Sequence, residues 1–452
     1  MGRLFGTDGA RGVANTELTC ETAMLIGRAA AVVLTRHTDH KPKLVIGKDT
    51  RISSDMLEAA LVAGICSVGA DVELLGTIPT PAVAYLVSKY EADAGVMISA
   101  SHNPVEYNGI KLFSNTGYKL SDDIEEEIEA LILDTPEKLP LKSGVALGRV
   151  SRAKNAVHDY VKHIMNTIDG NLEGMQVAID CANGSASATA ETLFKGLGAK
   201  PLIIHAEPDG TNINDGCGST HMEALTAFMK KHKCQLGVAF DGDADRCLAI
   251  DEQGNLIDGD KMIAIFAKYL KEQGKLKEDA AVVTVMSNLG FFHFAQREGI
   301  KAVSSKVGDR YVLEEMRKSG YVLGGEQSGH IIFGEYASTG DGQLSAVQLM
   351  SILRDYGKKA SAIAGVMERY PQVIVNVKAD ADGKARLNSD EEIAAAIQEC
   401  TDKLGSDGRV LVRASGTEPL IRVMVEGKDF DVINQYAVKI GETIKRQVGC
   451  EE

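Results

Sequence analysis

The chain has 452 residues, of which 44% are hydrophobic and 25% charged, and its formal net charge is −14. One hydrophobic core does not support a chain of this length, so we expect about three or four domains. The negative charge opposes nonspecific attraction to nucleic acid or to an anionic membrane surface, and the apolar stretches are interrupted well short of a membrane span. We therefore expect neither nucleic acid nor a membrane as a partner.

The eight cysteines form no C-x-x-C pair and are sparse for so long a chain. The N-terminal residues contain no apolar segment of the kind that directs export. Both observations favour a reducing, cytosolic compartment.

Three segments share one pattern: an apolar β-branched strand, an amphipathic stretch of helix length, and a second strand that opens near a glycine. They cover residues 43–75, 175–204 and 281–303. This alternation predicts βαβ units with mixed, largely parallel sheets, and functional loops at the carboxyl ends of strands. An apolar strand ending in polar residues and glycine does follow each segment, over residues 95–104, 236–246 and 321–330.

The pattern changes after Tyr370. Alternating valines over residues 373–377 predict a strand, and residues 391–404 are predicted to form a helix. We expect two strands on either side of residues 413–419 and a closing helix over residues 430–447. This combination indicates a smaller α+β domain. With the polar stretch 136–148 and the glycine-bounded segment 251–259 as boundaries, we expect α/β domains over residues 1–150, 151–250 and 251–369, and the α+β domain over residues 370–452.

Three carboxylates at alternate positions, Asp241, Asp243 and Asp245, follow the strand of the second repeat. Unpaired, they would repel one another, whereas a hard divalent cation such as Mg²⁺ turns the cluster into a binding site. With Glu252 they also match four positions of a calcium-binding EF-hand loop, but Arg246 stands where that loop needs glycine and a strand precedes it. A solvated acidic turn is the alternative, and the spacing favours metal binding.

Ser101 lies beside His102 in the sequence SASHNP, at the end of an apolar strand. A hydroxyl needs a base, a metal or prior modification to become reactive. The alternative is an ordinary turn capped by serine and asparagine. No G-x-S-x-G motif occurs, which argues against an α/β-hydrolase, and a serine that carries phosphate fits best beside a metal loop.

Two arginines, Arg413 and Arg422, bracket the loop SGTEP. Guanidinium groups and hydroxyls are the donors that a phosphate dianion needs, although a simple hairpin turn explains the loop equally well. No P-loop motif is present.

The sequence GGEQSGH over residues 324–330 crowds a carboxylate, an amide, a hydroxyl and an imidazole between glycines, a mixture suited to sugar hydroxyls. The alternative is a structural, partly buried His330. Near the N-terminus, FGTDGARG places Thr7 and Arg11 among glycines, and is either a flexible tail or a further phosphate-binding segment.

Taken together, FGTDGARG, ISASHNP with the downstream NGIK, DGDADR, GEQSGH and RASGTEP, in this order, resemble the motifs of the α-D-phosphohexomutase family. The resemblance covers nearly the whole chain. It implies four domains around a central cleft, three of them related α/β domains and the fourth smaller.

The resemblance further implies that Ser101 is phosphorylated in the active enzyme and that Mg²⁺ is held by Asp241, Asp243 and Asp245 together with that serine. General acid and base candidates are His102, Lys111 and His330, while Arg11 and Arg246 either lower a neighbour's pKa or steady the transferring phosphoryl group. The implied substrate-binding residues are Thr7, Gly308, Asp309, Glu326, Gln327, Ser328, Arg413, Ser415, Gly416, Thr417 and Arg422.

The implied reaction interconverts the 6-phosphate and the 1-phosphate of a hexose through a bisphosphate, which also serves as activator. Gln327 and Ser99 follow the branch of the family that acts on glucosamine phosphates and feeds amino-sugar and cell-wall synthesis, whereas relatives acting on glucose or mannose phosphates usually have Met and Thr there. An enzyme acting on glucose or mannose phosphates is therefore the first alternative. A noncatalytic sugar-phosphate-binding protein is the second, but the presence of Ser101 argues against it. The resemblance also makes a homodimer plausible.

Overall fold

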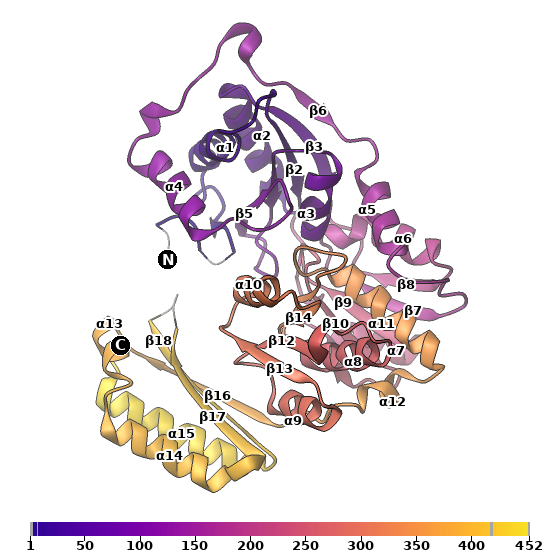
Figure 1. Cartoon of the computed structure of the whole chain (residues 1–452), viewed down its shortest axis with the longest axis vertical. Helices are drawn as coiled ribbons and strands as arrows, with labels where there is room; N and C mark the ends of the chain where they lie inside the picture. The colour runs from indigo at the N-terminus through magenta and orange to yellow at the C-terminus, as the bar shows by residue number, and fades with distance from the viewer. Residues whose placement is uncertain (1–2, 7, 416–418, 451–452) are drawn as a thin grey trace. The chain divides into compact units, whose positions relative to one another are not determined.

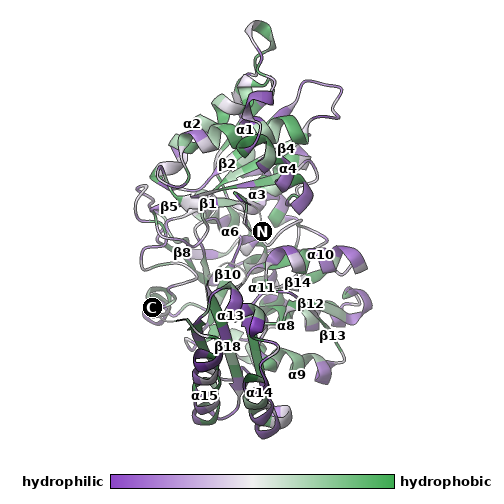
Figure 2. Ribbon diagram, turned by 90° about the vertical axis from the view of Figure 1, so that its left-hand side faces the viewer, coloured by the Kyte–Doolittle hydropathy of each residue, from purple (hydrophilic) through white to green (hydrophobic). Residues whose placement is uncertain are grey.

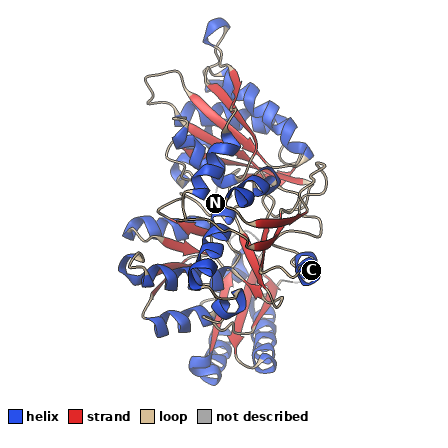
Figure 3. Ribbon diagram, turned by 90° about the vertical axis from the view of Figure 1, so that its right-hand side faces the viewer, coloured by secondary structure: helices blue, strands red, loops and turns tan. Residues whose placement is uncertain are grey.

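The computed structural model describes residues 3–6, 8–415 and 419–450 (Figure 1). The chain divides into two compact units. The larger unit comprises residues 1–286 and 299–366, and the smaller comprises residues 287–298 and 367–452. Helices and strands alternate along most of the larger unit (Figure 3).

The first sheet of the larger unit has six strands in the order β1-β5-β4-β2-β3-β6. Leu44 and Ile46 of its central strand β2 pack into a core beneath helices α1, α2 and α4, while Gly47 lies against Val83 of α3 on the opposite face. Burial on both faces explains why the strand sequence is apolar without alternation. The elements are β1 (Ala10–Val13), α1 (Cys20–Leu34), β2 (Lys43–Lys48), α2 (Ile52–Ser67), β3 (Asp71–Thr77), α3 (Thr80–Lys89), β4 (Ala94–Ile98), β5 (Tyr107–Ser114), α4 (Asp122–Leu133) and β6 (Val150–Arg152).

The second sheet has five strands in the order β11-β10-β9-β7-β8, and the third has four in the order β13-β12-β14-β15. The second region contains α5 (Ala156–Met165), β7 (Gln176–Asp180), α6 (Ala190–Gly196), β8 (Lys200–Ile204), α7 (Glu223–His232), β9 (Leu236–Phe240), β10 (Cys247–Asp251) and β11 (Leu256–Ile257). The third contains α8 (Gly259–Glu272), β12 (Ala280–Thr284), β13 (Lys301–Ser305), α10 (Asp309–Ser319), β14 (Leu323–Gly325), β15 (Ile331–Phe333), α11 (Gly342–Tyr356) and α12 (Ala360–Ala364).

The three sheets share one topology. In each, a first strand lies between two parallel neighbours, and the third strand in chain order returns through a hairpin to an antiparallel fourth strand. The sets are β2-β3-β4-β5, β7-β8-β9-β10 and β12-β13-β14-β15. The repeats predicted from the sequence are therefore confirmed, and the polar motifs at 99–106, 241–246 and 326–330 occupy equivalent hairpin loops.

The smaller unit is an antiparallel sheet in the order β16-β18-β17 with helices packed on it. Its core joins Ile421 and Val423 of β18 to Ile433 and Ile440 of α15. Figure 2 shows α14 and α15 carrying both hydrophilic and hydrophobic residues, as amphipathic helices do. The elements are α9 (Leu289–Glu298), β16 (Gln372–Lys378), α13 (Ala381–Arg386), α14 (Glu391–Leu404), β17 (Gly408–Ala414), β18 (Leu420–Gly427) and α15 (Phe430–Val448).

Short 3-10 helices complete the chain at η1 (Pro136–Lys138), η2 (Gly144–Ala146), η3 (Ser185–Ala188), η4 (Lys277–Asp279) and η5 (Gly405–Asp407). Among the described residues, no helix combines the length and hydropathy that crossing a bilayer requires. The α/β fold class with a smaller α+β C-terminal part is confirmed, while the domain boundaries expected at residues 150, 250 and 369 stay predictions.

Candidate active site

Ser101 lies in the β4–β5 hairpin loop, buried and in the left-handed backbone region with φ 52°. Its Oγ donates a hydrogen bond to Asp241 Oδ2 at 2.6 Å, and its backbone N–H donates to Ser99 Oγ at 2.9 Å. A left-handed conformation is costly for a residue with a side chain, so the surroundings must hold it in place. The loop thus presents one hydroxyl to a carboxylate from the next repeat.

Arg51, which the sequence analysis missed, holds this loop through hydrogen bonds to its backbone carbonyl oxygens. Its fully buried guanidinium group donates to the carbonyl oxygens of Ser101 at 3.0 Å and Asn103 at 2.7 Å, to Tyr107 at 3.1 Å, and also to that of Pro104. Asp49 Oδ2 accepts from Arg51 Nε at 2.9 Å. The pair explains why the polar sequence KDTR follows the first strand of the first repeat.

The carboxylates of Asp241, Asp243 and Asp245 lie together in the β9–β10 hairpin loop, with one oxygen of each within 4.8 Å of the others. All three side chains are buried. Burial and the neighbouring carboxylates of Asp245 and Asp243 raise the pKa of Asp241 well above its ordinary value. Asp243 Oδ1 and Asp245 Oδ1 are buried and accept no hydrogen bond from the described residues. Orphaned buried acceptors of this kind need a positive partner.

Lys111 of β5 supplies part of that charge. Its Nζ lies 2.8 Å from Asp243 Oδ2, 3.4 Å from Asp245 Oδ2 and 3.2 Å from Asp8 Oδ2. Burial by itself lowers the pKa of Lys111, but the carboxylates of Asp243, Asp8 and Asp245 outweigh it and hold the pKa above its ordinary value. Lys111 is therefore a protonated, fully buried ammonium group.

His102 is a neutral imidazole in this arrangement. Burial lowers its pKa to about 4, and the positive charges of Arg246 and Arg11 act in the same direction. Arg246 Nη1 lies 3.1 Å from His102 Nδ1, and because a guanidinium group can only donate, Nδ1 accepts and the ring proton is on Nε2. Ser101 Oγ lies 3.3 Å from the same Nδ1.

His330 is buried between two carboxylates, with Nδ1 at 3.7 Å from Asp245 Oδ2 and Nε2 at 3.5 Å from Asp309 Oδ2. Burial lowers its pKa, but Asp245 and Asp309 more than compensate, so the pKa lies above its ordinary value. The backbone N–H of Gly340 donates to Nε2 at 3.0 Å, which places the proton of the neutral ring on Nδ1, facing Asp245.

A chain of alternating charges connects the first and third repeats. Lys119 Nζ, at the end of the first repeat, contacts Asp8 Oδ1 at 2.6 Å and Asp309 Oδ2 at 2.5 Å. Arg11 forms an ion pair with Asp8. Over its described residues, the N-terminal segment is therefore part of the site and not a flexible tail.

The β14–β15 hairpin loop brings Glu326 beside Asp309, since the backbone N–H of Gly308 donates to Glu326 Oε1 at 3.0 Å. Burial raises the pKa of Glu326, and His330 and Arg246 partly offset the rise. Several buried polar atoms of the predicted site residues have no hydrogen-bond partner: Arg11 Nε, Arg246 Nε, Gln327 Nε2 and Ser328 Oγ. Such groups need partners that the described residues do not supply, such as water or a polar ligand.

In the smaller unit, Arg413 of β17 pairs directly with Arg422 of β18 across the antiparallel ladder. Burial lowers the pKa of Arg413, and Arg422 lowers it further. Like charges placed opposite each other are unfavourable unless an anion neutralises them. Ser415 is buried at the end of the same strand, and its carbonyl accepts from Lys384 Nζ at 2.8 Å. Thr7, Gly416 and Thr417 lie outside the described residues.

Within the larger unit, the structure thus brings together most of the predicted residues. Those around the carboxylates are Arg11, Ser101, His102, Lys111, Asp241, Asp243, Asp245, Arg246, Asp309, Glu326 and His330. Gly308 joins them through Glu326, and Gln327 and Ser328 follow in the same loop. Two further residues contact the site: Thr80 Oγ1 donates to Asp243 Oδ2 at 2.5 Å, and Asn214 Nδ2 donates to Ser101 O at 2.9 Å. Sequence reasoning missed these two, and also Asp8, Asp49, Arg51 and Lys119. Asp8 lay inside a recognised motif, whereas Thr80 and Asn214 carry no local signal.

Models of all four domains of the phosphoglucomutase/phosphomannomutase family match the chain. Alpha/beta/alpha domains I, II and III match residues 2–139, 158–254 and 258–370, and the C-terminal domain matches residues 374–442. The chain belongs to this family, and the resemblance inferred from the five motifs is confirmed.

Comparison with curated relatives indicates one branch of this family. Phosphoglucosamine mutase of Acetivibrio thermocellus is 54% identical over 449 residues, covering 99% of this chain and 100% of the relative. That of Clostridium novyi is 55% identical over 450 residues, covering 100% of both. Among solved structures, a phosphoglucomutase/phosphomannomutase family protein from Burkholderia thailandensis shares the fold, with a TM-score of 0.83, 23% identity and coverage of 99% of each chain.

Proposed function

We propose that this chain interconverts glucosamine 6-phosphate and glucosamine 1-phosphate by way of a phosphorylated Ser101. The observation that carries the proposal is the Ser101 hydroxyl, held at 2.6 Å from Asp241 in a buried carboxylate cluster. Relatives 54% and 55% identical over essentially the full length are named phosphoglucosamine mutase. The amino-sugar phosphate is therefore the substrate that the comparisons favour.

The carboxylate cluster fits a magnesium ion. Its donors are all oxygens, as a hard cation prefers, and one oxygen each of Asp243 and Asp245 accepts no hydrogen bond from the described residues. Asp241, Asp243 and Asp245 would hold the ion. When bound, Mg²⁺ neutralises negative charge on a transferring phosphoryl group.

In the proposed reaction the 1-hydroxyl of glucosamine 6-phosphate attacks the phosphorus of phosphorylated Ser101, and the bond from phosphorus to the serine Oγ breaks. Glucosamine 1,6-bisphosphate forms, turns round, and returns its 6-phosphoryl group to Ser101. Phosphoryl transfer depends mainly on positioning and charge. Lys111, Arg246 and Arg11 supply the fixed positive charge, and Arg246 already lies 3.1 Å from His102 beside the serine. A hexose bisphosphate that dissociates would serve as activator.

The acid and base roles follow from the titration behaviour of the three candidates. Lys111 is protonated, so in this proposal it donates a proton or stabilises charge and accepts none. His102, with its pKa lowered to about 4, is a weak base. His330, whose pKa lies above its ordinary value, is the stronger base of the two histidines and is kept as an acid and base candidate; it can accept a proton at Nε2 only after the hydrogen bond from the Gly340 N–H is broken.

Sugar recognition is assigned to the β14–β15 hairpin loop, because Glu326 accepts from hydroxyl groups while Gln327 Nε2 and Ser328 Oγ are buried donors without partners. Gly308 and Asp309 support that loop. Arg413 and Arg422, with Ser415, Gly416 and Thr417, are assigned to the nonreacting phosphate because two opposed guanidinium groups match a dianion. Thr7 is included by its motif. We also propose that the protein is cytosolic, that its domains meet near residues 150, 250 and 369, and that it forms a homodimer.

The test is phosphorus NMR of the purified protein with Mg²⁺ and a trace of hexose 1,6-bisphosphate, offered glucosamine 6-phosphate and glucose 6-phosphate in parallel. Faster appearance of glucosamine 1-phosphate is expected. Preference for glucose would keep the mechanism and overturn the substrate. No turnover of either sugar, in a sample shown by mass spectrometry to carry phosphate on Ser101, would overturn the enzymatic proposal.

A further inference from the structure

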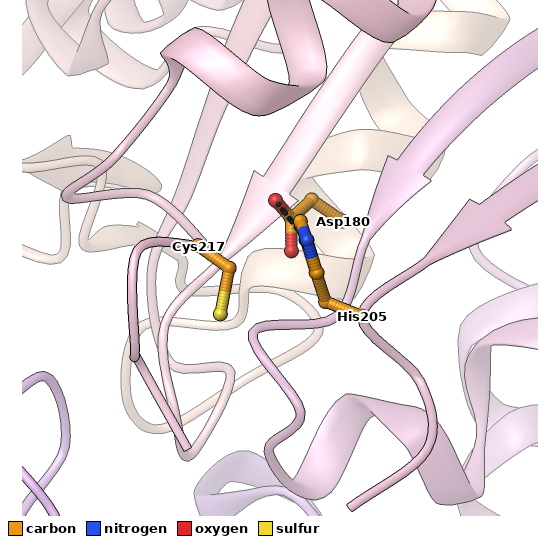
Figure 4. A group of neighbouring side chains, drawn as sticks. All are labelled: Asp180, His205 and Cys217. Atoms are coloured by element: carbon orange, nitrogen blue, oxygen red, sulfur yellow. Dashed lines mark hydrogen bonds and ion pairs between the residues drawn. The ribbon is translucent and has the colours of Figure 1, made fainter. Parts of the chain in front are cut away.

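A second group of side chains of types that can ligate a metal lies in the second repeat, and it shares no residue with the active site. Asp180 ends β7, His205 follows β8 directly, and Cys217 lies in the loop before α7. Figure 4 shows the three side chains side by side, with the Asp180–His205 interaction dashed. One ligand atom from each lies within 4.8 Å of the other two. No step of the proposed reaction uses them.

We propose that Asp180, His205 and Cys217 bind one divalent cation of the zinc class. The three residues offer one oxygen, one nitrogen and one sulfur, and a thiolate with an imidazole selects Zn²⁺ or Co²⁺ over Mg²⁺ and Ca²⁺, which prefer oxygen alone. The all-oxygen active-site cluster has the opposite preference. The chain therefore carries two cation sites that differ in chemistry.

Burial and access both suit an ion. Asp180 and Cys217 are 0% exposed, whereas the His205 side chain is 32% exposed. The carboxylate and the thiol are thus withdrawn from water, and the imidazole faces it. Three protein ligands with one solvent-accessible side leave a position for water, a coordination pattern that zinc adopts in proteins.

The ligands are held in place by their neighbours. Asp180 Oδ1 accepts from the backbone N–H of Ala182 at 2.9 Å, which directs Oδ2 to His205 Nδ1, also at 2.9 Å. Gly218, next to Cys217, is packed so closely that a Cβ there would lie 2.6 Å from Phe240 O. The backbone next to the thiol therefore packs directly against the end of β9.

Binding is balanced by the loss of one proton. The Cys217 thiol releases its proton to solvent, and the His205 proton moves from Nδ1, where it faces Asp180, to Nε2, which frees the Nδ1 lone pair for the cation. No oxidant or further reactant is needed. Since a proton is released, binding tightens as pH rises.

The site also connects to the serine loop. Asn214, three residues before Cys217, donates through Nδ2 to the carbonyl oxygens of Ser101 at 2.9 Å and Asn103 at 3.1 Å. Its own backbone N–H donates to Ala182 O at 2.9 Å. A cation that fixes the loop 205–217 therefore also steadies the support of Ser101.

The experiment titrates full-length protein, freed of transition metals, with Co²⁺ in saturating Mg²⁺, which occupies the oxygen-rich site. One equivalent of Co²⁺ should produce the ultraviolet charge-transfer absorption of a cobalt–thiolate bond, and Zn²⁺ should abolish it. Cys217→Ser should remove this absorption. Cys234→Ser, which changes another buried cysteine of the same sheet region, should keep it.

His205→Ala changes a half-buried side chain and guards against a Cys217→Ser variant that fails to fold. We expect it to weaken Co²⁺ binding by at least about tenfold, because even outer-shell partners of metal ligands contribute 10–100-fold. Zn²⁺ should also slow hydrogen exchange of the peptide spanning residues 99–109 in the wild type and not in His205→Ala. The proposal is overturned if no thiolate absorption forms, if it survives Cys217→Ser, or if His205→Ala binds Co²⁺ as tightly as the wild type.

Discussion

Arg51→Met tests the claim that one buried guanidinium group maintains the conformation of the serine loop. Methionine replaces the stem of the side chain with a similar apolar volume and removes every donor. The substitution deletes hydrogen bonds to four loop carbonyl oxygens, including those of Ser101 and Asn103, and the ion pair with Asp49. We expect the loop to open locally while the rest of the sheet stays folded.

The size of the effect follows from burial. Both side chains of the Arg51–Asp49 pair are 0% exposed, and removing one partner of a buried pair costs about 3–5 kcal/mol because a buried charge is left uncompensated. That free energy corresponds to an increase of about 100-fold to 5000-fold in the population of the opened loop. Burial already raises the pKa of Asp49, against the opposing charge of Arg51, so without Arg51 the pKa rises further.

The pH dependence has a definite sign. A carboxyl whose pKa in the folded state exceeds its unfolded value binds more protons when folded, so its contribution to stability falls as pH rises through the folded-state pKa. In Arg51→Met the destabilisation should therefore be greatest at neutral and alkaline pH and shrink as the pH is lowered through the raised pKa of Asp49.

Hydrogen exchange followed by mass spectrometry measures this directly on the peptide spanning residues 99–109. Its amides include that of Ser101, bonded to Ser99 Oγ, and that of Asn103, bonded to Ala100 O. Arg36→Met is the matched control, because Arg36 and Glu127 form an exposed ion pair expected to contribute about 1 kcal/mol or less. Exchange no faster in Arg51→Met than in this control would show that Arg51 does not hold the loop.

Four further predictions concern the active site. Ser101→Ala should abolish mutase turnover with an unchanged circular dichroism spectrum, because the phosphoryl carrier is lost; full activity would remove the central proposal. Asp243→Ala should weaken Mg²⁺ dependence at least about tenfold, since one of three clustered ligands and a partner of Lys111 are lost; an unchanged Mg²⁺ titration would point to a merely solvated loop. The pKa of His102 is lowered to about 4, so the folded protein binds fewer protons than the unfolded chain between that value and the ordinary one, and stability contributed by this group should be lost as pH falls through the window; NMR titration of the ring near pH 6.5 in unphosphorylated protein would contradict this. Gly242→Ala should slow turnover more than tenfold at nearly unchanged KM, because a Cβ there would lie 2.6 Å from Ser101 O; steady-state kinetics beside Gly365→Ala, a position with φ −67° where the nearest atom to a Cβ would be 3.4 Å away, provides the comparison.

Local sequence signals were sufficient for the repeats and the carboxylate cluster. Strands such as β2 and β9 are short apolar runs bounded by polar residues and glycine, so hydrophobic patterning locates them. Asp241, Asp243 and Asp245 lie within five residues of one another, and their mutual repulsion could be recognised without knowing the fold. The order of the motifs along the chain then pointed to the loops at residues 99–106 and 326–330 as further parts of the site.

The supporting residues were not predictable in this way because their roles come from contacts between repeats. The residues next to Lys119 in the sequence give no sign of a functional role. Its ammonium group nevertheless contacts both Asp8 and Asp309, and Asp309 lies 190 residues after Lys119. Asn214 contacts a loop 113 residues earlier. Likewise, protonation could not be read from residue types: Lys111 and His102 were equivalent acid and base candidates until burial and neighbouring charges separated them.

The equivalent placement of the three hairpin loops bears on how such an enzyme could evolve. Each loop is anchored by two strands of its own sheet, so residues at one tip can be exchanged without repacking another core. In the proposed function, the phosphoryl carrier, the cation cluster and the sugar contacts thus lie on three different loops carried by repeats of one topology. A swap of the 326–330 loop between relatives should transfer sugar preference while leaving the phosphoryl-transfer chemistry of the recipient in place.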